Sequence, residues 1–193
     1  MICPLPIQTL EYHAVISSTN DRMKELFKHP VVPPLPCLVI AKQQTAGRGR
    51  ENKAWWSGEG AVLMSVGFGL SPATVSRNEL PLLSVTAAQA VMTVLKRYLP
   101  ENKIELHLPN DVYVEEKKIC GILLESPSPS FGILGIGLNV NNRLRDIPPE
   151  FQAEFEKRPF TSMIEMLGRE LPLPRLCEEI LTELAVPLHC ITY

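Results

Sequence analysis

The chain has 193 residues, of which 45% are hydrophobic, and its formal net charge is −2. This length and composition are typical of one globular domain with a real hydrophobic core. The near-neutral charge excludes the basic footprint of a nucleic-acid-binding protein and the cationic face of a membrane-surface protein, so we expect neither kind of partner.

The cysteines and the N-terminus indicate a reducing compartment. The five cysteines are scattered and have no C-x-x-C spacing, which argues against a disulfide framework and a thiolate zinc site. The first residues lack the basic and apolar regions of a signal peptide, and no run of about 18 apolar residues occurs. We therefore expect a cytoplasmic protein in which residues 1–193 form a single domain.

The N-terminal half predicts a helix, two strands and a second helix. Residues 19–28 open with cap-type residues and carry apolar side chains at helical spacing, and 37–41 form an apolar run of strand length. The polar stretch 42–60 has no periodicity and predicts a loop, followed by a buried strand at 61–68. Residues 79–98 repeat apolar side chains every three or four positions, which predicts a helix.

The C-terminal half predicts an antiparallel meander and then helices. Apolar runs at 112–114, 119–124 and 133–140 have short connections, and a parallel crossover would need a dozen residues or more. Ser162 and Glu165 have the spacing of a capping pair. After a proline break, one more helical face is formed by Leu176, Ile180, Leu181 and Leu184. The fold class predicted is therefore α+β (α/β), with a mixed, largely antiparallel sheet flanked by helices.

The most informative segment lies in the predicted loop. Residues 43–50 read Gln-Gln-Thr-Ala-Gly-Arg-Gly-Arg and continue to Trp-Trp-Ser at 55–57. Two glycines alternating with two arginines describe a mobile loop whose backbone can approach a ligand and whose guanidinium groups can grip phosphate. The spacing is neither G-x-G-x-x-G nor that of a Walker A loop. A flexible surface loop that carries arginines is the alternative interpretation.

Two further segments carry candidate site residues. The Pro-Asn-Asp triplet at 109–111 also fits a plain turn, but Lys118 directly precedes an apolar strand that would hold its amine over the sheet. Gly135 and Gly137 lie on one strand face and clear space for something flat or for another backbone, and Asn139 continues that face. A bulge or a close-packed neighbouring strand is the alternative explanation for the glycines.

Together these segments resemble the biotin protein ligases. The catalytic domain of that family shows, in order, Ser-Thr-Asn, a Gln-x-x-Gly-Arg-Gly-Arg loop ending in tryptophan, Trp-Pro-Asn-Asp, Lys-x-x-Gly-Ile-Leu and Gly-Ile-Gly-x-Asn-Val. The resemblance extends from about residue 13 to 185 and implies a fold related to the class II aminoacyl-tRNA synthetases. The matching segments are 18–20, 44–55, 109–111, 118–123 and 135–140.

The sequence departs from the family pattern in three ways. His107-Leu108 stand where the family has Lys-Trp or Arg-Trp before Pro-Asn-Asp, which alters a basic residue and an aromatic residue near the site. No helix-turn-helix precedes the motifs and no small β-barrel follows them in the sequence. We therefore expect a single biotin/lipoate ligase catalytic domain without a repressor role.

The resemblance implies an ATP-dependent biotin protein ligase. Such an enzyme forms biotinyl-5′-AMP and transfers biotin to a lysine of the biotin carboxyl carrier protein of acetyl-CoA carboxylase, using ATP and Mg²⁺. Lys118 would act between the biotin carboxylate and the α-phosphate, while Arg48 and Arg50 hold phosphate. Asp111 would hold Mg²⁺, directly or through a water, or accept the proton of the acceptor lysine, and both roles stay open.

The same resemblance assigns the remaining site residues and leaves alternatives open. A lipoate or octanoate ligase and a non-catalytic biotin-binding or adenylate-binding protein are the competing functions, and a homodimer is one open oligomeric state. In this assignment Gly135 and Gly137 make room for adenine. The residues assigned to biotin are Ser18, Thr19, Asn20, Gln44, Gly47, Arg48, Gly49, Arg50, Lys118 and Gly121. The residues assigned to ATP are Arg48, Arg50, Trp55, Asn110, Asp111, Lys118 and Asn139.

Overall fold

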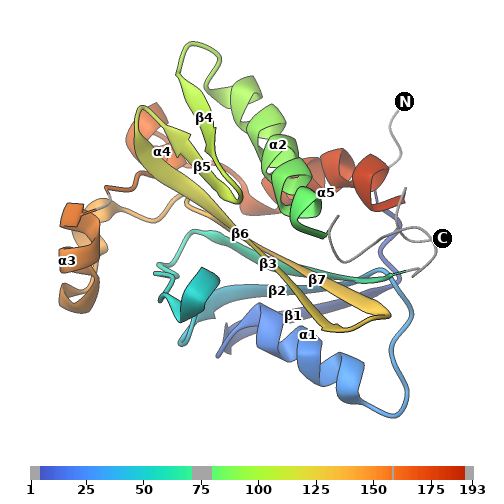
Figure 1. Cartoon of the computed structure of the whole chain (residues 1–193). Helices are drawn as coiled ribbons and strands as arrows, with labels where there is room; N and C mark the ends of the chain where they lie inside the picture. Colours follow the sequence, from blue (N-terminus) through green and yellow to red (C-terminus); the bar gives the residue numbers. More distant parts are fainter. Residues whose placement is uncertain (1–4, 71–79, 158, 190–193) are drawn as a thin grey trace.

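The computed structural model describes residues 5–70, 80–157 and 159–189. One seven-stranded sheet carries helices on both of its faces (Figure 1). The elements in chain order are β1 (Thr9–Ile16), α1 (Thr19–Lys28), β2 (Cys37–Gln44), η1 (Arg50–Asn52), β3 (Val62–Gly69), α2 (Leu80–Tyr98), β4 (Ile104–His107), β5 (Asp111–Val114), β6 (Lys117–Ser128), β7 (Phe131–Leu138), η2 (Leu144–Asp146), α3 (Pro149–Lys157), α4 (Met163–Leu167) and α5 (Leu173–His189).

The sheet is mixed and mostly antiparallel, which confirms the predicted fold class. Its strand order is β1-β2-β3-β7-β6-β5-β4. β1 and β2 are parallel and are connected through α1, and every other neighbouring pair is antiparallel. The predicted element order began with a helix and is wrong at that point, because β1 precedes α1. It also lacked β4, the strand at the other edge, and α3.

The helices divide the sheet into a covered face and a partly open face. α2 and α5 lie over one face and α1 lies over the other (Figure 1). The larger core fills the α2 and α5 side, and the smaller core lies under α1, where Met23 and Phe27 pack on Cys37, Val39 and Ile133. Since α1 packs on β2, β3 and β7, the part of this face toward β6 and β5 stays available for a site.

Each predicted helix in the described part of the chain is present, but the predicted capping pair is wrong. α4 begins after Ser162, whose hydroxyl is buried and makes no capping hydrogen bond. The carboxylate of Glu165 instead accepts from the backbone of Leu144. The first amides of α4 donate to the carbonyls of Asn139 and Val140 at the end of β7, so the helix needs no side-chain cap there.

The described cysteines behave as small core residues. Cys37, Cys120 and Cys177 are free and buried, while Cys3 and Cys190 lie outside the described residues. Burial raises the pKa of the Cys37 and Cys177 thiols to about 11 and raises that of Cys120 further. These three thiols are therefore protonated and unreactive at neutral pH. In the described part of the chain, each helix is too short or too polar to cross a lipid bilayer.

Candidate active site

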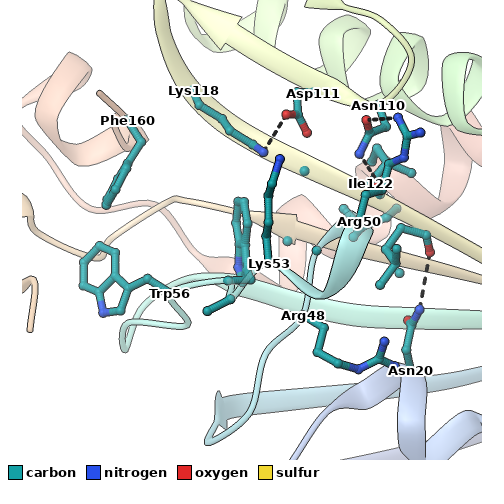
Figure 2. A pocket seen from close by; sticks show the side chains of 18 of the residues that line it. Asn20, Arg48, Arg50, Lys53, Trp56, Asn110, Asp111, Lys118, Ile122 and Phe160 are labelled. Atoms are coloured by element: carbon teal, nitrogen blue, oxygen red, sulfur yellow. Dashed lines mark hydrogen bonds and ion pairs between the residues drawn. The ribbon is translucent and has the colours of Figure 1, made fainter. Parts of the chain in front are cut away.

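A cavity of about 290 Å³ opens on the sheet face that α1 leaves partly uncovered. This volume is at the lower end of the range of roughly 300–1,000 Å³ that is usual for small-molecule pockets. β6 and β7 form its floor, and the N-terminus of α1 and the loop after β2 form its walls. Figure 2 shows that charged side chains from β5, β6 and this loop point into it.

The structure brings nearly all the predicted site residues together in this cavity. Gly47 is the exception: its carbonyl accepts from the Trp55 amide, and an added Cβ would lie 2.6 Å from the Ser57 hydroxyl. Gly47 therefore shapes the loop from behind. The predicted residues that line the cavity are Ser18, Thr19, Asn20, Gln44, Arg48, Gly49, Arg50, Trp55, Asn110, Asp111, Lys118, Gly121, Gly135, Gly137 and Asn139.

One end of the cavity is cationic. The Lys118 ammonium lies 2.7 Å from a carboxylate oxygen of Asp111 and 5.4 Å from the centre of the Trp55 ring. Arg50 donates to the Asn110 amide oxygen at 3.4 Å. The side chain of Lys53 points toward Lys118 and Asp111 (Figure 2). Lys53 also lies 3.2 Å from a carboxylate oxygen of Glu51, which lines the cavity as well. Three cations thus outnumber two carboxylates, an arrangement suited to a negatively charged ligand.

Trp55 packs on the glycines of the floor. A Cβ added at Gly137 would lie 2.7 Å from the indole, and one added at Gly121 would lie 3.0 Å from it. A Cβ at Gly135 would meet the amide of Asn20. The space that Gly135 and Gly137 were predicted to clear for adenine is therefore filled by Asn20 and Trp55. Gly135 and Gly137 thus make room for other side chains of the site.

The opposite end of the cavity is polar and internally hydrogen-bonded. Gln44 accepts from the Thr19 amide at 2.8 Å and donates to Ser57 at 3.0 Å. The buried Ser65 hydroxyl lies 2.5 Å from the Asn20 amide oxygen and 2.8 Å from the Thr19 hydroxyl. Since an amide oxygen only accepts, Ser65 donates to Asn20, and the Thr19 hydroxyl in turn donates to the Gln44 amide oxygen at 3.1 Å. The positions of these side chains are fixed before any ligand binds.

Arg48 lies at this polar end, bound to two carboxylates. Its guanidinium forms an ion pair with Asp21 of α1 and lies 3.3 Å from a carboxylate oxygen of Glu125 on β6. Burial raises the pKa of the Asp21 carboxyl, but the hydrogen bond and charge of Arg48, together with Lys24, outweigh it and lower that pKa. The guanidinium that the sequence assigned to phosphate therefore contacts protein carboxylates.

Asn110 and Asn139 hold backbone segments at the cavity wall. The Asn110 amide donates to the Ile122 carbonyl at 2.8 Å, so the Pro-Asn-Asp turn is fixed to β6. Asn139 is buried; its amide donates to the Thr161 carbonyl at 3.1 Å and accepts from Asn142 at 3.0 Å. Contact of Asn139 with adenine remains a prediction.

Of the two residues that depart from the family motif, Leu108 lines the rim of the site and His107 stands beside it. His107 stacks on Tyr113, with ring centroids 3.8 Å apart. Leu108 is 75% exposed and lines the cavity beside Pro109. The substituted residues therefore leave the cavity floor unchanged and give its rim an apolar side chain.

Comparisons with known proteins agree with this geometry. The sequence profile described as "Biotin/lipoate A/B protein ligase family" matches residues 12–141, which include β2 to β7 and every predicted site residue. The chain belongs to the biotin/lipoate A/B protein ligase family. The predicted resemblance is confirmed at this level.

Individual members of the family are similar over most of the chain. A bifunctional ligase/repressor BirA of Bacillus subtilis is 33% identical over 179 residues, which cover 90% of this chain and 52% of that protein. A biotin–[acetyl-CoA-carboxylase] ligase of Mycobacterium tuberculosis is 34% identical over 116 residues, 58% of this chain and 42% of that protein. The chain thus spans about half the length of the curated relatives it matches.

A solved structure of the family has the same fold. The biotin protein ligase from Aquifex aeolicus in complex with biotin and ATP is 30% identical, covers 95% of this chain and 71% of its own, and has a TM-score of 0.75. The predicted fold class is therefore confirmed by a family member and by the sheet topology.

The residues present fit a Mg²⁺ ion held together with substrate phosphates. No cluster of three or more metal-binding side chains occurs among the described residues, so a protein-only cage is absent from that part of the chain. Mg²⁺ commonly needs only one or two carboxylates when phosphates supply other ligands. Asp111 offers one buried carboxylate oxygen that has no hydrogen-bond partner in the described structure.

Several site residues were missed from the sequence. Lys53 follows the glycine-arginine repeat and is the third cation of the cationic end, and Ser65 interrupts an otherwise apolar buried strand. Trp56 and Phe160 pack together with ring centroids 5.6 Å apart at the cavity wall. Glu125 lies on β6 two residues beyond Leu123. A polar residue inside an apolar run was a signal that could have identified Ser65.

Proposed function

We propose that this chain is an ATP-dependent biotin protein ligase. The observation that carries the proposal is a single cavity with a preorganised polar end around Asn20 and a cationic end around Lys118. A small acid with a polar head group fits the first end, and its carboxylate would then lie toward the second, where phosphate binds. The similarity to biotin protein ligases supports biotin and ATP as the substrates.

The polar end suits the ureido ring of biotin. The Asn20 amide donates to Glu125 and to the Leu123 carbonyl, and its oxygen accepts from Ser65. An amide oxygen has two lone pairs, so one is left to accept a ligand N–H. Ser18 and Thr19 supply hydroxyl groups beside it. An octanoyl chain or a dithiolane ring would offer these buried polar groups no hydrogen bonds, which favours biotin over lipoate or octanoate.

The cationic end suits formation of the adenylate. A biotin carboxylate oxygen attacks the α-phosphorus of ATP, the bond to the bridging oxygen breaks, and pyrophosphate leaves. Negative charge gathers on the phosphate oxygens during this step, and Lys118, Lys53 and Arg50 are positioned to stabilise it. When bound, Mg²⁺ would neutralise further phosphate charge, and Asp111 would hold it.

Transfer then forms the product amide. The amine of an acceptor lysine attacks the carbonyl carbon of the adenylate, AMP leaves, and the nitrogen loses one proton. Asp111 is paired with Lys118 at the cationic end and is the candidate acceptor of that proton if it does not hold the metal. We propose the biotin carboxyl carrier protein of acetyl-CoA carboxylase as the acceptor, because a similar ligase of M. tuberculosis carries that enzyme in its name.

Biotin transfer to a carrier domain tests the proposed function. A purified carrier domain is incubated with the chain, biotin and Mg-ATP, and the mass of the carrier is then measured by mass spectrometry. We expect one biotin to be added at one lysine. A carrier of unchanged mass, in the presence of ATP and a folded chain, would contradict the proposal.

A further inference from the structure

Glu125 lies just behind the cavity and binds two of its residues. It extends from β6 on the same face as Gly121 and Leu123, and its side chain is 21% exposed. The Asn20 amide donates to it at 2.9 Å and the Lys24 ammonium at 2.8 Å. The Arg48 guanidinium donates to both of its oxygens, at 3.3 and 3.4 Å. Three donors from two different segments therefore meet on one carboxylate.

The charges around Glu125 balance. Arg48 and Lys24 each contact both Glu125 and Asp21, so two cations alternate with two carboxylates. This network has no surplus positive charge to offer a phosphate. The cationic end has such a surplus, because three cations, Arg50, Lys53 and Lys118, outnumber its two carboxylates, Asp111 and Glu51. The geometry therefore separates Arg48 from the other cations of the cavity.

The two groups that Glu125 holds belong to different parts of the site. Asn20 is fixed on the floor by Glu125 on one side and by Ser65 on the other, which sets the direction in which its amide faces the cavity. Arg48 belongs to the loop between β2 and β3, which follows Gln44. A loop bound through one guanidinium can be held in place over a preorganised floor.

We propose that Glu125 is a positioning residue that couples the biotin head-group site to the glycine-arginine loop: it orients Asn20 and, with Asp21, anchors the loop through Arg48. This inference rests on the proposed function, because that function identifies biotin as the ligand of the head-group site. It assigns Arg48 to anchoring the loop and leaves the phosphate to Arg50, Lys53 and Lys118.

Biotin binding is the first test, with Glu125→Gln as the variant and Glu11→Gln as its matched control. Glu11 is also a partly buried carboxylate that binds an arginine of α1, Arg22, but it lies on β1 outside the cavity. We expect Glu125→Gln to weaken biotin binding without ATP at least tenfold by calorimetry. Glu11→Gln should keep the original biotin affinity.

Loop anchoring is the second test and needs no ligand. Trypsin cuts after arginine and lysine, and Arg50 and Lys53 are exposed loop residues. We expect Glu125→Gln to raise the rate of cleavage at these two sites at least fivefold, measured by mass spectrometry, and Glu11→Gln to leave it unchanged. Asp21→Asn breaks the anchor without touching Asn20, so it should release the loop and change biotin affinity less than Glu125→Gln does.

The outcomes separate the two proposals. Biotin affinity and loop cleavage that both stay within twofold in Glu125→Gln would overturn the positioning role, as would equal losses in Glu11→Gln. If Glu125→Gln does not fold, the cleavage rate of Asp21→Asn decides, and an unchanged rate overturns the anchor. If the unaltered chain binds no biotin, the proposed function fails, while the cleavage rates still support or overturn the anchor.

Discussion

The Lys118 ammonium lies 2.7 Å from one oxygen of Asp111, and the other oxygen of that carboxylate is buried without a hydrogen-bond partner in the described part of the chain. A fixed cation and an unsatisfied acceptor thus share one end of the cavity. An unpaired buried oxygen is costly, so it indicates that a ligand group completes the site.

Removing the Lys118 charge should abolish adenylate formation with little effect on folding. We expect Lys118→Ala to lower the rate of biotin-dependent pyrophosphate release by about 10²–10³-fold, the usual cost of one preorganised charge. The free energy of unfolding should fall by no more than about 1 kcal/mol, since the ion pair is partly exposed. Lys117→Ala is the control, because Lys117 is next to Lys118 in the sequence but its side chain is exposed and lies outside the cavity. Full activity in Lys118→Ala would refute the assignment.

Substituting Asp111 should separate its two candidate roles. If Asp111 holds Mg²⁺, Asp111→Asn loses pyrophosphate release and needs a higher Mg²⁺ concentration for the remainder. If it accepts the lysine proton, the variant forms the adenylate normally and only transfer is slowed. Single-turnover measurement of each half-reaction distinguishes the two. Normal rates in both steps would remove Asp111 from the mechanism.

Adding one methyl group at Gly135 should disturb the head-group site. An ideal Cβ there would collide with the Asn20 amide, which is held between Ser65 and Glu125 and cannot move freely. We expect Gly135→Ala to weaken biotin binding at least tenfold and to lower stability by about 1–3 kcal/mol. Gly69→Ala is the matched control on β3, because nothing lies within 4 Å of its added Cβ. Equal biotin affinities in the two variants would contradict this account of the floor.

A glycine at position 116 should stabilise the β5–β6 hairpin. Glu115 and Glu116 both have positive φ angles, 48° and 62°, which L residues adopt at a cost. The Glu115 carboxylate also accepts from the Lys103 amide, but no such bond holds Glu116 in the described structure. We expect Glu116→Gly to raise the free energy of unfolding by roughly 0.5–1 kcal/mol in urea titrations. Glu115→Gly should gain less, because it loses the bond to Lys103.

Acid should destabilise the fold partly through Glu125. Burial raises the pKa of this carboxyl, but hydrogen bonds from Lys24, Asn20 and Arg48 outweigh it, so the pKa lies below its usual value. A lowered folded pKa gives stability that is present above the unfolded value and is lost as pH falls through the folded one. Urea titrations from pH 7 to 3 should therefore show a shallower loss of stability in Glu125→Gln. An identical pH dependence would contradict the lowered pKa.

The elements with strong local patterns could be predicted, and those that depend on distant partners could not. The amphipathic helix 79–98 and the apolar runs of the meander carry their signal in neighbouring residues. β1 does not: Leu10 and Tyr12 are exposed at the sheet edge, and Glu11 pairs with Arg22. The capping pair at Ser162 failed because the carbonyls of Asn139 and Val140, which follow β7 and are distant in sequence, accept from the helix amides.

The site shows the same division. The glycine-arginine loop, Lys118 and Asp111 were recognisable because their motifs are contiguous, and the fold brings them to one cavity. Glu125 was missed because its partners Arg48 and Asn20 lie 77 and 105 residues away. The contact of Arg48 with two carboxylates could likewise not be predicted from the sequence. An arginine can bind either a phosphate or a carboxylate, and only the fold shows which of them lies next to it.

Pyrophosphate release from Mg-ATP in the presence of biotin tests the central claim most directly, with lipoate and octanoate measured alongside. The proposed function requires release that depends on biotin, is at least 100-fold faster than with either other acid, and is lost in Lys118→Ala. Release with lipoate or octanoate but not with biotin would contradict the assignment of the polar end around Asn20. No release with any acid, from a chain that still binds biotin, would show a non-catalytic binding protein.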